Sequence, residues 1–491
     1  MTENTGTQTV KRTNRFTRWL AGIGNSFVAF FKRIGRFFVE LWKMLRYGNW
    51  KTKLSLLIMG FGCFTYGQPL RGALYLILEV GFVLFMVFTG SYYLGKLGTL
   101  GTQVSEPIID PITGLPTNDR TPGDDSLAIL LFGIATVLII FVFAVMYYKQ
   151  FKNAYDNQTR SDFGMPITNT KQDLRNMLDK NFHTTLLALP TLGIVIGTII
   201  PLIFMILIAF TNYDKEHLTP NNLFTWVGLD NFKHLFDMQG ENSLGSTFFK
   251  LLGWTLLWAV LSTVTTYIGG MILAILINKK GVRFKKIYRG FFVLTIAIPQ
   301  FVSLLVVSKF FATENGLVNQ ILTSMGWITR NIRWLEDVNL ARFMVVIINM
   351  WVGIPYSMLI TSGILMNIPE ELYESARIDG AGPVTTFFKI TLPYMLFVTG
   401  PYLLTQFIGN INNFNVIFLL TGGGPTSPDL VAPAGKTDLL ITWLYNITVN
   451  GSYGDYKTGS VIGILVFIVC AVFSLSVYRN TSSVKNEEEF Q

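Results

Sequence analysis

The sequence predicts an all-α membrane protein that crosses the bilayer about eight times, and three observations lead to this fold class. Half of the 491 residues are hydrophobic and only 14% are charged, whereas soluble domains carry roughly 25% charged residues. The apolar residues gather in runs of about 20, the length that spans a bilayer as a helix. Basic residues gather between particular runs, as they do on the cytoplasmic side of membrane proteins.

Eight apolar runs are long enough to cross the hydrocarbon core as helices. They cover residues 72–95, 126–148, 186–212, 250–277, 290–312, 343–366, 394–412 and 458–478. Another run, 54–66, is interrupted after 13 residues by Gly67, Gln68 and Pro69. It is too short to span, so we expect it to be re-entrant or interfacial.

The chain begins with a basic segment, residues 1–53. This segment has eleven Lys and Arg residues against Glu3 and Glu40, a net charge of +9 (11 − 2), while the rest of the chain balances 28 basic against 28 acidic residues. From Phe16 to Leu45, apolar residues recur at helical spacing among basic ones. Such a helix is typical of an anionic membrane surface, and a cytoplasmic helix packed on a partner is the alternative. Because the excess charge is confined to this segment, we expect no nucleic-acid surface.

The distribution of Lys and Arg between the predicted spans indicates the orientation of the chain. Segments 149–185 and 278–289 contain six basic residues each, whereas 96–125 and 213–247 each contain two basic and five acidic residues. We therefore expect both termini and the two basic loops to be cytoplasmic. With this topology the segment 367–393 is cytoplasmic as well.

The sequence shows no pattern typical of a catalytic or metal centre. His183, His217 and His234 are the only histidines, and they are not at metal-ligand spacing. The Gly-Lys-Thr of "PAGKTD" lacks the first glycine of a phosphate-binding loop and falls in a predicted outer loop. Cys63 and Cys470 lie inside apolar runs, where buried thiols are expected. We expect no covalent chemistry, no metal and no cofactor on this chain.

A polar stretch, "NIPEELYESARIDGAGP" (367–383), separates two apolar spans. Pro369 suits a first helical turn, and the following glutamates favour the positive end of a helix. Gly380 or Gly382 can end it. A helix of two or three turns is not stable alone in water, so we expect it to dock on its own chain or on a partner.

This stretch resembles the EAA loop (367–393) of importer-type ABC permeases, which forms a coupling helix on the ATP-hydrolysing subunit. The resemblance lies in three groups of residues: Glu374, Ser375 and Ala376; Asp379, Gly380 and Ala381; and Ile390, Leu392 and Pro393. Serine replaces the second residue of the family's E-A-A triplet, and it is small enough to keep a close contact. The resemblance implies that the first two groups couple this chain to an ATPase.

Two further segments extend the resemblance, over about 186–479, to the larger permease subunits of maltose/maltodextrin importers. They are "WVGLDNF" (226–232) and "NMWVGIPYSM" (349–358) with "LLTGGGP". The resemblance implies a type I permease domain of six helices over 183–479 in a bacterial cell membrane. Two N-terminal helices in 54–182 would precede it, and a cytoplasmic tail, 480–491, would follow. Enterobacterial members carry an extra domain in the outer loop for which 213–247 is too short.

The resemblance also implies partners and a substrate. The partners are a second permease subunit, two ATPase subunits that bind ATP and Mg²⁺, and an extracellular sugar-binding protein. The substrates are oligosaccharides, with maltodextrins favoured and galacto-oligosaccharides as the alternative. An ion- or proton-coupled secondary sugar transporter is the rival class and would need essential carboxylates within the spans. We find only Glu79 well inside one, and we expect it to pack against protein.

Polar groups kept inside the spans are the candidate sugar-binding residues, because they are costly in the bilayer. Gln406, Asn410 and Asn413, spaced i, i+4 and i+7, are expected to share one helix face. Amides offer donors and acceptors to sugar hydroxyls, and interhelical hydrogen bonding is the alternative. The positions that match the family's sugar site are Asn349, Val352, Gly353, Tyr356, Gly409, Asn410 and Asn413, with Gln300 near another such position. Gly409 stands where the family has an aromatic residue.

Overall fold

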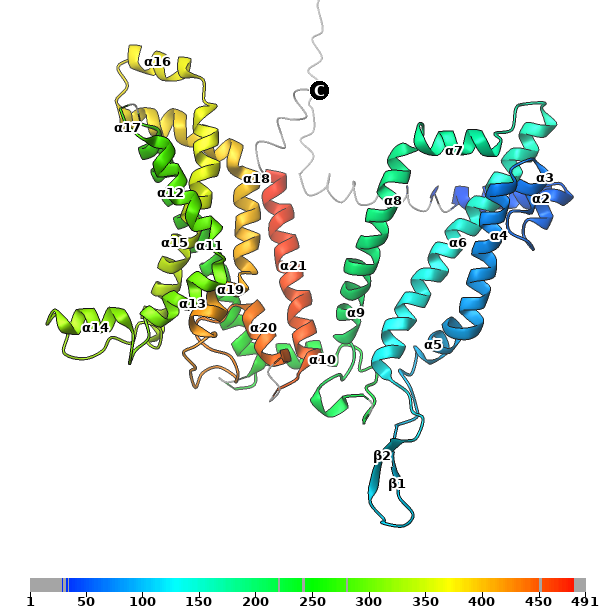
Figure 1. Cartoon of the computed structure of the whole chain (residues 1–491), viewed down its shortest axis with the longest axis horizontal. Helices are drawn as coiled ribbons and strands as arrows, with labels where there is room; N and C mark the ends of the chain where they lie inside the picture. The colour runs from blue at the N-terminus through cyan, green and yellow to red at the C-terminus, as the bar shows by residue number, and fades with distance from the viewer. Residues whose placement is uncertain are drawn as a thin grey trace, which may run out of the picture. The chain divides into compact units, whose positions relative to one another are not determined.

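The computed structural model describes residues 29–480, apart from 30, 31, 34, 220, 241–242, 280 and 450–452. Contacts divide the chain into two compact units, and Figure 1 shows the course of the chain through both. Unit 1 extends to Gly98 and resumes from Leu127 to Pro201; unit 2 comprises Thr99–Ser126 and the chain from Leu202 onward. The division falls inside the third predicted span.

Seven helices of the described residues are long and apolar enough to cross a membrane. They are Pro69–Lys96, Ser126–Asp162, Phe182–Ile208, Leu244–Asn278, Val338–Met366, Pro383–Thr421 and Tyr456–Tyr478. An eighth span exists if the bent pair α12 (Lys285–Ala297) and α13 (Gln300–Phe310) is counted as one. The fold is therefore helical with seven or eight spans, as the sequence predicts.

The predicted span 290–312 is not one straight helix, and this is a correction. Its two halves meet at 88°. Ile298, at the break, has the extended conformation (φ −79°, ψ 126°) that a following proline favours, and Pro299 itself cannot donate a helical hydrogen bond.

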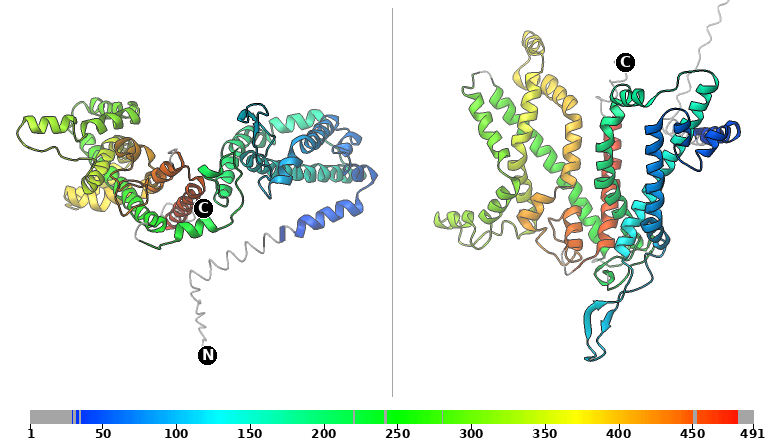
Figure 2. Two further views of the ribbon diagram at one scale, coloured as in Figure 1. Left: turned by 90° about the horizontal axis from the view of Figure 1, so that it is seen from below. Right: turned by 45° about the vertical axis from the view of Figure 1, so that its right-hand side comes forward.

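Unit 1 contains two long helical segments and several shorter helices. Its elements are α2 (Trp50–Leu54), α3 (Phe61–Thr65), α4 (Pro69–Phe85), η1 (Met86–Gly90), α5 (Ser91–Lys96), α6 (Ser126–Asp162), α7 (Thr170–Leu178), α8 (Phe182–Ile194) and η2 (Val195–Ile199). α4 and α6 lie side by side in both views of Figure 2, and the rings of Phe82 and Phe143 stack between them with centroids 3.7 Å apart.

The segment 54–66 passes through the end of α2, a turn and α3, and its irregular backbone bonds to α6. Gln150 Nε2 donates to the carbonyl of Ser55 at 2.8 Å, and the Tyr147 hydroxyl donates to the carbonyl of Leu56 at 2.7 Å. The N–H of Met59 donates to Glu79 Oε2 at 2.9 Å. These partners satisfy backbone groups that have no partner in a helix, and they agree with Glu79 as a carboxylate that packs against protein.

The predicted amphipathic helix 16–45 lies largely outside the described residues, and so does the predicted tail after residue 480. Residues 35–47 are helical. Glu40 joins this helix to α6, accepting hydrogen bonds from the Tyr148 hydroxyl at 2.9 Å and from Lys152 Nζ at 3.0 Å.

Unit 2 contains the remaining helices and one small sheet. The helical elements are α9 (Ile200–Ile208), η3 (Lys215–His217), α10 (Asp230–Phe236), α11 (Leu244–Asn278), α12, α13, α14 (Leu317–Ser324), α15 (Val338–Met366), α16 (Glu370–Ile378), α17 (Pro383–Thr386), η4 (Phe387–Thr391), α18 (Leu392–Ile411), α19 (Phe414–Thr421), α20 (Leu440–Val449) and α21 (Tyr456–Asn480). The sheet is an antiparallel hairpin of β1 (Pro107–Ile109) and β2 (Pro116–Arg120), which the sequence did not predict.

α11 and α15 pack closely because small residues face one another along their contact. A Cβ added at Gly353 of α15 would lie 2.6 Å from Thr266 Cγ2 of α11, and one at Gly270 of α11 would lie 2.6 Å from Ser357 Cβ of α15. Either atom would be closer than van der Waals contact allows. This helix pair lies at the centre of unit 2, and both α12 and α18 pack against each of its helices.

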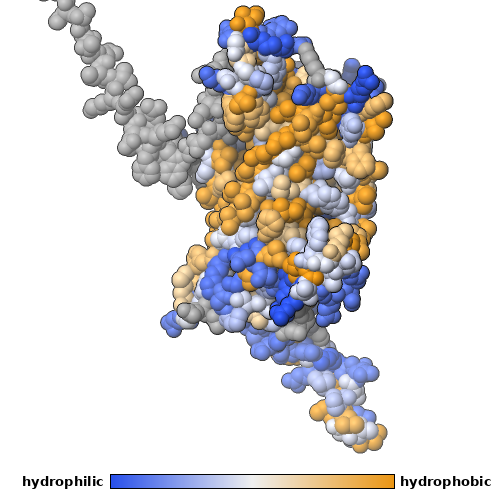
Figure 3. All heavy atoms as spheres, turned by 90° about the vertical axis from the view of Figure 1, so that its left-hand side faces the viewer, coloured by the Kyte–Doolittle hydropathy of each residue, from blue (hydrophilic) through white to orange (hydrophobic). Residues whose placement is uncertain are grey.

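The surface of unit 2 matches a bilayer. Figure 3 shows a broad apolar belt between two polar ends on the face of this unit. Large side chains such as Phe291, Leu294 and Phe343 are 67%, 61% and 59% exposed in the single chain. In water this exposure would be costly, whereas in a membrane lipid or a partner subunit covers it.

Candidate functional site

Three of the predicted sugar-site amides meet where α15 passes the junction of α18 and α19. Asn413 Nδ2 lies 3.4 Å from Oδ1 of Asn349 and 3.4 Å from Oδ1 of Asn410. Asn413 is also the N-cap of α19, accepting a hydrogen bond from the N–H of Val416 at 3.3 Å. The structure therefore brings together residues that are 64 positions apart in the chain.

The single-face geometry expected for these amides is wrong in one respect. α18 ends at Ile411, so Asn413 projects from the start of the next helix and not from the face that carries Gln406 and Asn410. Two consecutive residues with non-helical ψ, Asn412 (22°) and Asn413 (87°), make the break. Asparagine favours such positions because its side chain can replace a backbone partner.

Asn410 connects the amide cluster to α11 by two hydrogen bonds. Its Nδ2 donates to Thr263 Oγ1 of α11 at 3.0 Å, and its backbone carbonyl accepts from Trp258 Nε1 at 3.1 Å. Asn349 and Asn410 are 7% and 8% exposed, while Asn413 is half-buried. Asn413 is thus the member that an entering ligand reaches with the least rearrangement. Thr263 was missed in the sequence, where nothing separates it from the other hydroxyls of its span.

A second amide pair lies beside the broken helix. Gln300 is the first residue of α13, directly after the 88° bend, and its Oε1 lies 3.4 Å from Asn415 Nδ2 of α19. Ser308 Oγ of α13 donates to the carbonyl of Leu420 at 3.1 Å. The broken helix is therefore held against the helix that Asn413 caps.

The other predicted sugar-site residues have different surroundings. Gly353 faces Thr266 at the α11–α15 contact, and Val352 packs on the apolar cluster around Trp258 and Ile348. Tyr356 is 48% exposed, with its ring centroid 6.2 Å from that of Tyr402. A Cβ at Gly409 would meet no atom within 4 Å. Whether these residues contact sugar stays a prediction.

The predicted polar helix is present as α16, with an end that the sequence explains. The N–H of Ala381 donates to the carbonyl of Ala376 at 2.8 Å, and that of Gly380 donates to Arg377 at 3.1 Å. Together with φ +76° at Gly380, this is the Schellman arrangement that favours glycine. Asp379 is the C-cap residue, and Pro369 the N-cap.

α16 has one anchored face and one open face. Ala376 is buried on the inner face, and the Tyr373 hydroxyl lies 3.1 Å from Thr391 Oγ1 of η4. Glu374 and Ser375 are exposed, and Ile378 is 87% exposed. An apolar side chain on such an open face is typical of a protein-docking surface.

The lysine and threonine side chains of the Gly-Lys-Thr in "PAGKTD" bond to residues of this chain. Lys436 Nζ donates to Asp429 Oδ2 at 2.6 Å, and this bond holds the pKa of the Asp429 carboxyl well below its ordinary value. Thr437 Oγ1 lies 2.8 Å from Thr421 Oγ1. The described residues contain no group of three or more His, Cys, Asp or Glu side chains that could hold a metal ion.

A broken span, amides gathered beside it, and an anchored polar helix with an open face define the membrane subunit of a transport system. Residues 266–483 match the family described as "Binding-protein-dependent transport system inner membrane component". The galactooligosaccharides transport system permease protein GanP of Bacillus subtilis (strain 168) is 31% identical over 436 residues, which cover 88% of this chain and 98% of that protein. The chain belongs to this family of binding-protein-dependent permeases, and the predicted ABC importer permease is confirmed.

Two further comparisons agree with the family. The maltodextrin transport system permease protein MdxF of the same bacterium is 32% identical over 446 residues, 89% of this chain and 97% of that protein. A crystal structure of a bacterial ABC transporter involved in the import of the acidic polysaccharide alginate matches with a TM-score of 0.51 and 23% identity, over 63% of this chain and 98% of that chain. That structure supports the type I permease fold.

Proposed function

We propose that this permease imports neutral oligosaccharides, maltodextrins first, and that Asn349, Asn410 and Asn413 contribute to the sugar pathway. The observation that carries the proposal is the meeting of these uncharged amides within the membrane-spanning helices. Amides both donate to and accept from hydroxyls, which suits a neutral, polyhydroxylated ligand. The 3.4 Å contacts of Asn413 lie at the long end of hydrogen bonding, so a sugar hydroxyl can replace them at little cost.

The relatives support two substrate classes almost equally. MdxF transports maltodextrin and GanP galactooligosaccharides by their names, at 32% and 31% identity. Maltodextrin is favoured because the maltodextrin permease MalC of Streptococcus pneumoniae (strain TIGR4) is also 30% identical over 445 residues. Galacto-oligosaccharides are the second candidate.

The proposed partners follow from the open face of α16 and from the family. A second permease subunit would complete the pathway, and an extracellular binding protein would deliver the sugar. Two ATPase subunits would bind ATP and Mg²⁺, with Glu374, Ser375 and Asp379 presented to one of them. Closure of the ATPases would move α16 and shift the permease between its inward-open and outward-open states. Both termini and α16 would face the cytoplasm.

The ion-coupled alternative finds no support in the structure. Glu79, the carboxylate on which it depended, accepts a hydrogen bond from the backbone of Met59. A proton relay requires a carboxylate poised toward a pathway, whereas this one satisfies the turn between α2 and α3.

The test is sugar uptake in a strain that lacks this chain and is complemented by variants. Wild type is expected to restore uptake of labelled maltotetraose and not of a labelled galacto-oligosaccharide. Asn413→Ala is expected to reduce uptake strongly. Asn339→Ala, which removes an exposed amide from the first turn of α15, is the matched control and should leave uptake intact. Equal uptake by both variants would remove the amide cluster from the pathway, and galacto-oligosaccharide uptake alone would reassign the substrate.

A further inference from the structure

A pocket of about 1120 Å³ opens between α16 and the adjoining ends of α11, α12 and α15. Among the described residues that line it, four are cations, Lys279, Lys285, Arg289 and Arg377, and one is an acid, Glu370. The formal charge of these five side chains is +3 (4 − 1). Like charges gathered around one pocket repel one another, so the pocket favours a bound anion.

Arg289 presents a donor that the protein does not satisfy. Its guanidinium bonds to Asn278 Oδ1 through Nη2, which also lies 3.6 Å from Met366 Sδ. Its Nε is buried and has no hydrogen-bond partner. A buried donor without an acceptor is costly, and a guanidinium matches the oxygens of a phosphate group.

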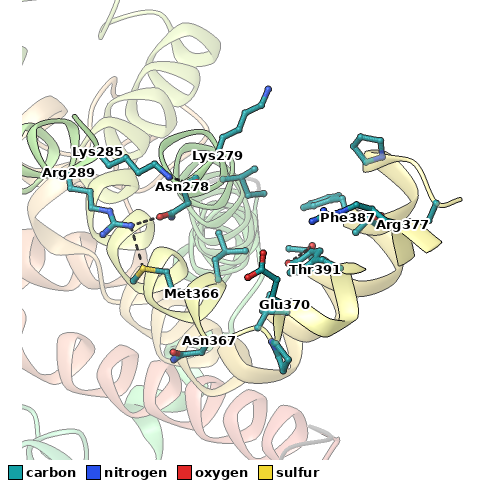
Figure 4. Close-up of a pocket in the computed structure, with 18 residues that line it drawn as sticks. Asn278, Lys279, Lys285, Arg289, Met366, Asn367, Glu370, Arg377, Phe387 and Thr391 are labelled. Atoms are coloured by element: carbon teal, nitrogen blue, oxygen red, sulfur yellow. Dashed lines mark hydrogen bonds between the residues drawn. The ribbon is translucent and has the colours of Figure 1, made fainter. Parts of the chain in front are cut away.

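Lys285 converges on the same place. Its Nζ donates to the carbonyl of Asn278 at 2.9 Å, and Figure 4 shows Lys285 and Arg289 approaching Asn278 from one side. In the same view Glu370 and Arg377 come from the opposite side of the pocket, on α16. Two separate parts of the fold thus supply the charged groups.

The face of α12 that carries these cations continues as an apolar surface. Positions 285, 289, 293 and 296 follow one another at helical spacing and share this face. Val293 and Ile296 are 40% and 42% exposed. A ligand that fits the whole face has an anionic head at Lys285 and Arg289 and an apolar body that lies along Val293 and Ile296.

We propose that this pocket binds the phosphate of an anionic phospholipid from the leaflet on the α16 side of the membrane. The basic loop 278–289 predicts that this leaflet is the cytoplasmic one, which is rich in anionic lipid. A bound headgroup would bridge α12 and α16 and so connect the lipid composition of the membrane to the helix proposed to contact the ATPase. The lipid site does not depend on which sugar is transported.

The test is titration of the purified full-length chain with phosphatidylglycerol in mild detergent, read by native mass spectrometry. Wild type is expected to retain one tightly bound phosphatidylglycerol, and phosphatidylcholine should not replace it. The double variant Lys285→Gln/Arg289→Gln is expected to bind roughly 25-fold more weakly, about five-fold for each surface cation removed. Lys286→Gln is the matched control, since this exposed neighbour on α12 is outside the pocket lining.

A gain-of-binding variant separates loss of the site from loss of the fold. Glu370→Gln removes the acid from the pocket and is expected to tighten phosphatidylglycerol binding, which misfolding cannot do. Titration with inorganic phosphate distinguishes the source of the anion: binding of phosphate alone, without the lipid, would overturn the lipid assignment. Equal lipid affinity in the double variant and Lys286→Gln would overturn the site. The site would also be overturned if the double variant bound phosphatidylglycerol like wild type but no longer co-purified with the ATPase, because a carboxylate of that partner would then be the occupant.

Discussion

Gly353 can be tested as a packing residue by adding one methyl group to it. In Gly353→Ala the new Cβ would stand 2.6 Å from Thr266 Cγ2, about 1 Å closer than carbon atoms normally approach. Overpacking of this kind costs about 1–3 kcal/mol, and the better helix propensity of alanine returns about 1 kcal/mol. The variant is therefore expected to be less stable than wild type by up to about 2 kcal/mol, since α11 and α15 must separate.

A second substitution removes the clash. In Gly353→Ala/Thr266→Ser the Cγ2 methyl is absent. The positions of Thr266 Oγ1 and Cβ, which remain, lie 3.3 and 3.6 Å from the new Cβ of residue 353. We expect the double variant to regain the melting temperature of wild type in detergent and to regain sugar uptake. Thr266→Ser alone is the control. Recovery of stability without uptake would show that Gly353 contacts the sugar, and a single variant as stable as wild type would refute the packing argument.

Burial raises the pKa of Asp438 to about 6 from an ordinary 3.8. The protonated carboxyl therefore contributes stability that is fully present below pH 3.8 and is lost as the pH rises through 6. Relative to Asp438→Asn, the free energy of unfolding of wild type should fall by up to about 3 kcal/mol between pH 4 and 7, measured by thermal unfolding. Gly380→Ala should destabilise the end of α16 by about 1–2 kcal/mol, and Gly380→Asn by less. Sugar-stimulated ATP hydrolysis should therefore fall further in Gly380→Ala than in Gly380→Asn. A double-mutant cycle between Asn410 and Thr263 should give a coupling of about 0.6 kcal/mol, and a coupling of zero would contradict their 3.0 Å hydrogen bond.

The spans could be predicted from the sequence because length and hydropathy decide them locally. The broken one could not, because prolines at similar positions behave differently. α15 continues through Pro355 and α18 through Pro401, whereas the chain bends by 88° before Gln300. Whether a helix bends at proline depends on what satisfies the freed backbone groups, and that information lies in the neighbouring helices.

More of the α16 site than of the amide cluster could be predicted from the sequence. The end of α16 follows from local residues, since Gly380 adopts the positive φ that a Schellman motif requires. The amides of α15 and α18 were recognised, but the contact of Asn410 with Thr263 depends on the packing of α11. The hairpin β1–β2 was missed because its strands are only three and five residues long, too short to show a period of two.

The coupling role of α16 can be measured directly as ATP hydrolysis by a complex reconstituted from this chain with the proposed partner permease and ATPase. Glu374→Lys, on the open face of α16, is expected to abolish the stimulation of hydrolysis by the sugar-loaded binding protein. Asp119→Lys, the same charge change at an exposed position of β2, should leave the stimulation intact. Normal stimulation in Glu374→Lys would contradict the assignment of α16 as the helix that couples this permease to its ATPase.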